Sequence, residues 1–296
     1  MPLHDPLASM SRSVIAAVAT WLTIAAAAHA GEAATQGRIV NDLPYKSGDG
    51  LSAYEQERCR LDIYLPPGSA AATNAPVLIF FHGGAITAGD KDSAKTIAAL
   101  VNAHGIVAVG VNHRLSPKVH YPDYIRDCAA AIAWVKNNIA QYGGSPLKLF
   151  VSGHSAGGYL TMMAALGPGY LEAVGLKLSD IAGLIPISGQ MVTHSTVREE
   201  RGIPRSVIVV DEAAPLQHVR KIPTPVLSIC GGQDMPARLE ENLLMDAWLK
   251  AAGNTDVSIL CVSNRTHTSV YDRCAEPGDK AGQAIGAFIL KHSSAP

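Results

Sequence analysis

The sequence lacks an excess of charge of either sign. Its 24 lysines and arginines nearly balance 25 aspartates and glutamates, so the formal net charge is -1, and no stretch is strongly basic. This balance argues against a nucleic-acid partner, which usually requires a concentrated positive surface. The chain also lacks internal repeats and extended low complexity. With 296 residues, 48% of them hydrophobic, it can bury a sizeable core in a single α/β domain.

Metal-binding patterns of cysteine are missing as well. The spacing of the five cysteines matches no zinc site, so we expect no metal. In an oxidising compartment one or two disulfides are allowed, and the odd count leaves at least one thiol over. For any given pair of cysteines, an equally good interpretation is that both are buried as small hydrophobic side chains and form no disulfide. The five are Cys59, Cys128, Cys230, Cys261 and Cys274.

The N-terminus has the pattern of an export signal. Arg12 precedes a mostly apolar run from Val14 to Ala28, and Ala28-His29-Ala30 supplies the small residues of a cleavage site. We therefore predict a signal peptide over residues 1–30, cleaved after Ala30, and a periplasmic or secreted mature protein without a membrane segment. The alternative is an uncleaved anchor, although the apolar run is short for a spanning helix.

Strand and helix patterns alternate through the rest of the chain, after a polar, glycine-containing leader. Continuous apolar runs such as Pro76–Phe81 suit strands that are buried on both faces. The alternation predicts a mainly parallel sheet flanked by helices, in one domain over residues 31–296. The predicted strands are 59–65, 76–81, 106–111, 147–152, 181–188, 225–230 and 256–262, and the predicted helices are 92–104, 123–142, 159–166, 237–252 and 280–291.

The regular alternation stops between about residues 189 and 224. This segment has one short apolar run, Val207–Val210, and a cluster of charges at Arg198–Arg201. We therefore predict a small cap-like insertion over the site rather than a second domain. Such loops often determine which substrate is accepted. A solvated helix face is the simpler interpretation of the charge cluster.

One motif organises the chain: Gly153-His154-Ser155-Ala156-Gly157. An apolar run precedes it and a segment of helix-forming composition follows it. A serine on a tight turn between strand and helix has a strained backbone, and small neighbours allow the chain to approach it closely. By itself the pattern would arise by chance in roughly one such chain in six. In this context it predicts that Ser155 is a nucleophile.

A second feature, His82-Gly83-Gly84-Ala85, follows the predicted strand 76–81. Two glycines leave the backbone amides free of side chains, so the amides of Gly83 or Gly84, together with that of Ala156, are predicted to form an oxyanion hole. The alternative is an ordinary glycine turn.

Asp234 and His267 each follow a later predicted strand, where sites form in open α/β sheets. The chain order Ser155, Asp234, His267 is that of α/β-hydrolases. His267 is predicted to act as general base and then acid, and Asp234 to orient its imidazole. Asp211 is a weaker candidate acid because it lies in the irregular segment. The other histidines lack the full context of a position after a predicted strand in this chain order. We interpret His82 as a residue that structures its own loop.

Taken together, these motifs resemble the α/β-hydrolase carboxylesterases with a His-Gly-Gly oxyanion loop. The most similar groups are bacterial feruloyl and acetylxylan esterase-like hydrolases and kynurenine formamidase-like hydrolases, and Arg114-Leu115-Ser116-Pro117 adds to the resemblance. The likeness runs from about Cys59 to the C-terminus. The chain departs from two subgroups, with Ala85 in place of a third glycine and Ile86 in place of a tryptophan.

The resemblance implies a serine carboxylesterase that needs no cofactor. Together with the predicted export signal, it implies an exported enzyme that acts on small-molecule or polysaccharide-linked esters, such as acetyl or feruloyl esters of plant polysaccharide. Its activity is expected to rise with pH as His267 loses its proton. Two alternatives use the same fold. An arylformamidase would hydrolyse amides with the same residues, and a non-catalytic ligand-binding member would not need His267.

Overall fold

The computed structural model describes residues 37–68 and 74–293, so the predicted signal peptide lies outside the described residues. Its centre is an eight-stranded sheet in the order β1-β2-β4-β3-β5-β6-β7-β8. Strands β1 and β2 run antiparallel to their neighbours, and all other pairs are parallel. The strands are β1 (Arg38–Pro44), β2 (Arg60–Leu65), β3 (Ala75–Phe81), β4 (Val107–Val111), β5 (Gly144–His154), β6 (Gly183–Ile187), β7 (Val226–Gln233) and β8 (Val257–Thr266).

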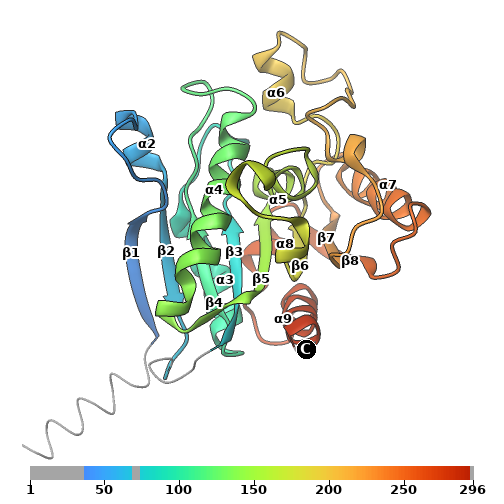
Figure 1. Cartoon of the computed structure of the whole chain (residues 1–296). Helices are drawn as coiled ribbons and strands as arrows, with labels where there is room; N and C mark the ends of the chain where they lie inside the picture. The colour runs from blue at the N-terminus through green and yellow to red at the C-terminus, as the bar shows by residue number, and fades with distance from the viewer. Residues whose placement is uncertain (1–36, 69–73, 294–296) are drawn as a thin grey trace, which may run out of the picture.

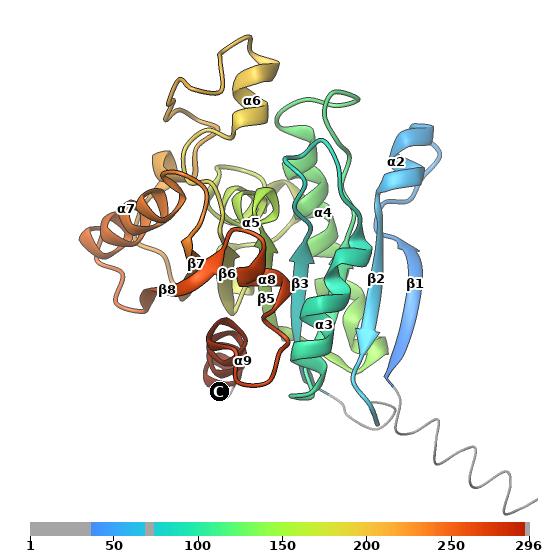
Figure 2. The ribbon, with the colours of Figure 1, turned by 180° about the vertical axis from the view of Figure 1, so that it is seen from behind.

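Helices cover both faces of this sheet. Figure 1 shows α4 and α5 in front of the sheet, and the reverse view in Figure 2 shows α3 and α9 on the opposite face. The predicted mainly parallel sheet flanked by helices is therefore confirmed. The helices are α2 (Ala53–Arg58), α3 (Ala94–Asn102), α4 (Asp123–Asn138), α5 (Ala156–Leu166), α6 (Ser195–Glu200), α7 (Arg238–Ala251), α8 (Ser269–Asp272) and α9 (Lys280–Ser293).

The core consists of two layers, one on each face of the sheet. In β3, Val77 and Ile79 pack into the layer under α4 and α5, whereas Leu78 and Phe80 pack into the layer under α3 and α9. Successive side chains of a strand point to opposite faces, so a strand covered on both sides must be apolar throughout. This explains the continuous apolar run of the sequence, since each such side chain contributes about 1.5–3 kcal/mol on burial.

The parallel strands bring their carboxyl ends to one edge of the sheet. The segment between β6 and β7 lies beyond this edge, and α6 stands apart from the sheet in Figure 1. The hydroxyl of Tyr159 in α5 donates to the carbonyl of Ala213 at 2.8 Å and so attaches the segment to α5. The short apolar run Val207–Val210 is not a strand, because these residues lie in a loop and three of the side chains are exposed.

Candidate active site

Ser155 lies at the sharp turn between β5 and α5. Its backbone angles, φ 57° and ψ −117°, are unusual for a residue with a side chain. A Cβ atom on Gly157 would lie 1.9 Å from the carbonyl oxygen of Phe81, and one on Gly153 would lie 2.4 Å from the backbone of Gly157. The Ser155 amide donates to the Ile187 carbonyl at 2.9 Å. Both glycines of the motif are therefore required by backbone packing around the serine.

The structure brings together the three residues that the sequence singled out. Ser155 Oγ lies 2.8 Å from His267 Nε2, and His267 Nδ1 lies 2.6 Å from Asp234 Oδ1. The carboxylate accepts a hydrogen bond from Nδ1–H, so Nε2 is left to accept a hydrogen bond from the serine hydroxyl. Asp234 follows β7 directly, and His267 follows β8. The arrangement can remove a proton from Ser155 and return it to a leaving group.

The carboxylate of Asp234 is held in its charged form. Burial alone would raise its pKa, but hydrogen bonds from His267, from the Ser188 hydroxyl and from the Met235 amide keep that pKa below its usual value. Ser188 Oγ donates to Oδ2 at 2.5 Å, and the Gly231 amide donates to the same oxygen at 3.2 Å. Sequence reasoning missed Ser188. Its position directly after the strand 183–187, at the same edge of the sheet, was the available indication.

His154 supports the histidine of the site, a role that the sequence did not indicate. Its Nε2 lies 2.7 Å from the carbonyl oxygen of His267, and its ring stacks on Tyr271 with 5.1 Å between ring centres. Burial, together with the charge of His267, lowers the pKa of His154 to about 4. His154 is thus neutral near pH 7 and donates from Nε2, which fixes the loop that carries His267.

The predicted oxyanion loop lies against Ser155. A Cβ atom on Gly83 would lie 3.3 Å from the Cβ of Ser155, and one on Gly84, where φ is 101°, would lie 2.3 Å from the Ala88 carbonyl oxygen. Among the described residues, the amides of Gly83, Gly84 and Ala156 donate to no acceptor. Free amides beside the nucleophile are available to a negatively charged oxygen.

His82 and Asp211 have structural partners of their own. The Nδ1 of His82 lies 2.7 Å from the carbonyl oxygen of Gly83, and its ring stacks on His113. Asp211 accepts from the Thr193 hydroxyl at 2.7 Å and pairs with Arg201 at 2.8 Å. Asp211 therefore braces the segment between β6 and β7, and the structure does not bring it to His267.

The described residues contain no group of three or more histidine, cysteine or acidic side chains that is placed to hold a metal. All five cysteines are free thiols, and of these only Cys261 is exposed. Within residues 37–68 and 74–293, no helix is both long and apolar enough to cross a bilayer.

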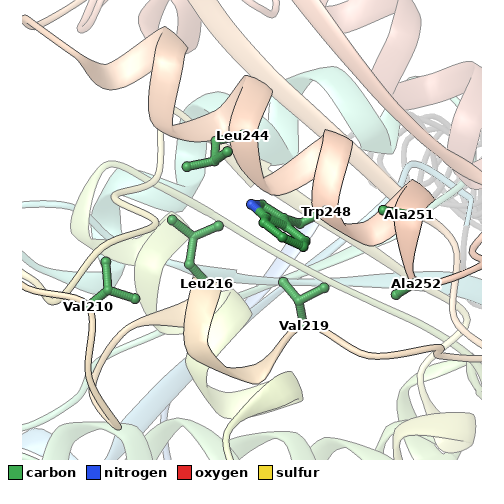
Figure 3. A pocket seen from close by; sticks show the side chains of 7 residues that line it. All are labelled: Val210, Leu216, Val219, Leu244, Trp248, Ala251 and Ala252. Atoms are coloured by element: carbon green, nitrogen blue, oxygen red, sulfur yellow. The ribbon is translucent and has the colours of Figure 1, made fainter.

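An apolar groove of about 580 Å³ lies between α7 and the segment that precedes β7. Figure 3 shows Trp248 between Leu244, Leu216 and Val219. Over half of the Trp248 side chain is exposed, at 56%. None of Ser155, Asp234 or His267 lines this groove, so it is separate from the candidate active site. Its lining consists of Val210, Leu216, Val219, Leu244, Trp248, Ala251 and Ala252.

A mainly parallel sheet that presents a serine, an aspartate and a histidine, in that chain order, at its carboxyl edge is the arrangement of the α/β-hydrolase fold. Residues 61–174 match the family described as BD-FAE. The chain is 37% identical over 132 residues to the probable carboxylic ester hydrolase LipM of Mycobacterium tuberculosis, covering 44% of this chain and 30% of LipM. It is 29% identical over 268 residues to the esterase LipQ of the same organism, covering 84% of this chain and 61% of LipQ.

Solved structures show the same fold. A truncated carbohydrate esterase from gut microbiota matches with a TM-score of 0.70 and 20% identity, over 88% of this chain and 98% of that one. Esterase 2 of Thermogutta terrifontis matches with a TM-score of 0.67 and 21% identity, over 86% and 94% of the two chains. The α/β-hydrolase fold is therefore confirmed, and the resemblance to carboxylic ester hydrolases is supported by the relatives' names. The chain spans less than two thirds of the length of LipM and LipQ.

Proposed function

We propose that the protein is an exported serine carboxylesterase that forms an acyl-enzyme on Ser155. The observation that carries this proposal is the continuous set of hydrogen bonds from Ser155 Oγ through His267 to Asp234. The strained turn presents the hydroxyl at the edge of the sheet, and three unpartnered amides lie beside it. Nucleophile, base, orienting acid and oxyanion donors are the parts that acyl transfer requires.

The first half of the reaction acylates the serine. Ser155 Oγ attacks the ester carbonyl carbon while His267 Nε2 takes the hydroxyl proton, and Asp234 stabilises the resulting imidazolium. The carbonyl oxygen becomes an oxyanion that accepts from the amides of Gly83 or Gly84 and of Ala156. When the carbon–oxygen bond to the alcohol breaks, the alcohol takes the proton from His267.

The second half releases the acid. A water molecule gives a proton to His267 Nε2 as its oxygen attacks the acyl carbon, and the same oxyanion forms again. The bond to Ser155 Oγ then breaks, and the serine takes back the proton from Nε2. No external cofactor enters either half.

The substrate class rests on similarity. The BD-FAE match and the carbohydrate esterase among the structural neighbours support esters attached to carbohydrate, such as acetyl or feruloyl esters of plant polysaccharide. The apolar run before Ala30 supports export to the periplasm or the exterior, where polysaccharide would be met.

Hydrolysis of p-nitrophenyl acetate by the purified protein and by its Ser155→Ala variant tests the mechanism. We expect the variant to lose at least about a thousandfold in kcat, because the residues of such a triad act as one unit. Equal rates would mean that the activity is background and would favour a non-catalytic ligand-binding protein. Faster turnover of a formanilide than of the acetate would replace the esterase by an arylformamidase.

A further inference from the structure

Arg238 is a buried cation without a partner. It is the first residue of α7, four positions after Asp234, and only 8% of it is exposed. Its Nε and Nη1 make no hydrogen bond, and no carboxylate oxygen of the described residues lies within 4 Å of its guanidinium. Arg265 is equally buried but pairs with Asp279 at 2.5 Å. Natural proteins rarely bury a charge unpaired, so Arg238 requires an explanation.

The two carboxylates whose charges act on Arg238 already have other partners. Asp234 binds His267 and Ser188, and Glu241 accepts from the Met191 amide at 2.8 Å. Burial lowers the pKa of the Arg238 guanidinium, and the nearby charges of Glu241 and Asp234 only partly oppose this. The protein itself thus leaves the positive charge uncompensated.

The start of α7, which carries Arg238, lies close to the candidate active site. Asn242 Nδ2 donates to the Gly189 carbonyl at 2.8 Å, and a Cβ atom on Gly189 would lie 2.8 Å from the backbone of Gly158 in α5. The charge of the Arg238 guanidinium also helps to lower the pKa of His154, which precedes Ser155 in the turn, and that of His194 in the segment between β6 and β7. The ring of His194 packs on Tyr159 of α5 with 5.0 Å between ring centres. Arg238 therefore lies where this segment meets the serine turn and the orienting acid.

His194 adds a second donor at this place. Its Nδ1 accepts from the Thr196 amide at 3.1 Å, so the neutral ring carries its proton on Nε2. Among the described residues, that Nε2 has no hydrogen-bond partner. Two neighbouring groups, Arg238 and His194, thus present donors and no acceptor.

We propose that Arg238, with the Nε2–H of His194, binds a carboxylate carried by the ester substrate, so that the preferred substrates are anionic esters. A guanidinium presents a planar pair of donors that matches the two oxygens of a carboxylate. A bound carboxylate would supply the counter-charge that the fold omits. The substrate preference rests on the proposed esterase function; the carboxylate site itself does not.

Matched ester pairs test the preference. One pair places the charge on the acyl part, mono-p-nitrophenyl glutarate against p-nitrophenyl butyrate; the other places it on the alcohol part, 4-acetoxybenzoate against its methyl ester. We expect kcat/KM to favour the anionic member of at least one pair. In Arg238→Gln that preference should fall at least tenfold, mainly through KM, and Arg238→Lys should restore part of it.

Arg205→Gln is the matched control. It removes one positive charge from the segment between β6 and β7, but Arg205 is exposed and pairs with Glu199 at 2.5 Å. We expect it to leave the preference unchanged. No preference in the wild type for either pair, or an equal loss in Arg238→Gln and Arg205→Gln, would overturn the proposal.

Binding without turnover gives a second readout. In the Ser155→Ala protein, glutarate or benzoate should raise Tm by at least 2 °C, and adding Arg238→Gln should abolish this shift. Without ligand, Arg238→Gln should itself raise Tm, because an unpaired buried charge is removed. A lower Tm together with an unchanged ester preference would show a structural role instead. An Arg238-dependent Tm shift in a protein without esterase activity would retain the carboxylate site and reject only the esterase.

Discussion

The carboxylate of Asp234 depends on a serine from a neighbouring strand end. Ser188→Ala removes the donor to Oδ2, a charge-assisted bond worth about 1.5–3 kcal/mol. We expect kcat/KM for a simple ester to fall about tenfold with little change in KM, because Asp234 orients His267 less firmly. The pKa of Asp234 should also move up toward its ordinary value, because one of the hydrogen bonds that keep it low is lost.

Ser152→Ala is the matched control for this prediction. Ser152 is also a buried serine in the sheet, but its hydroxyl donates to the Ile185 carbonyl and does not touch the site. If both variants reduce kcat/KM equally, the effect of Ser188 is one of general packing and the assigned role is wrong.

Gly157 shows how closely the backbone is packed behind the nucleophile. Gly157→Ala would place a methyl group 1.9 Å from the Phe81 carbonyl oxygen, and neither backbone can move without disturbing Ser155. We expect the variant to lose about 3 kcal/mol or more of folding free energy, measured by urea denaturation. Gly50→Ala, where a Cβ meets nothing within 4 Å, should change stability by less than about 0.5 kcal/mol.

The sequence indicated the principal side chains of the site but not their supports. Ser155, Asp234 and His267 could be predicted because each lies within a few residues of the end of a predicted strand. The roles of His154 and Ser188 were missed, because their partners, the His267 carbonyl and Asp234, are 113 and 46 positions away in the sequence, and the strand-end position of Ser188 does not identify its partner. Their roles depend on distances between loops, and no local pattern encodes those distances.

At the scale of elements, one hydroxyl connects α5 to the segment between β6 and β7. Tyr159→Phe leaves the buried Ala213 carbonyl without its donor, which we expect to cost about 1–3 kcal/mol. Limited proteolysis should then cut residues 188–225 faster than in the wild type. Tyr142→Phe is the control, since its hydroxyl makes no hydrogen bond among the described residues. Unchanged cleavage in Tyr159→Phe would show that other contacts hold the segment.

The central strands of the sheet were the easiest elements to predict from the sequence. Strands β3 and β4 are continuous apolar runs because both of their faces are covered. Strand β1 went unnoticed in the polar leader because most of its side chains are exposed, and α2 because it buries none. The predicted helix 123–142 is α4 followed by a 3₁₀ turn over Ile139–Tyr142, a distinction that composition does not make.

At the scale of the whole molecule, four buried histidines make stability depend on pH. Burial is the main cause in each: it lowers the pKa of His113 and His154 to about 4, that of His194 to about 3, and that of His82 well below its usual value. In the unfolded chain these groups bind protons near pH 6.5. Between about pH 6.5 and pH 4 the unfolded state thus binds more protons, so the free energy of unfolding falls as pH falls.

The size of this effect is measurable. His113, His154 and His194 should each cost about 2 kcal/mol between pH 7 and pH 5, and His82 adds to the loss in the same direction. Urea denaturation at pH 7, 6 and 5 checks this directly. A free energy of unfolding that stays constant over this range would contradict the burial of neutral imidazoles.

The register of β1 and β2 determines at which end of the sheet the described chain begins. Arg38 pairs with Leu65, while Leu61 pairs with Val111 near the carboxyl end of β4, so the described chain begins at the opposite end of the sheet from Ser155. Figure 1 shows the end of α9 at that same lower side. A support, fusion partner or tether held beside Arg38 or beside the end of α9 would therefore lie at the opposite end of the sheet from Ser155.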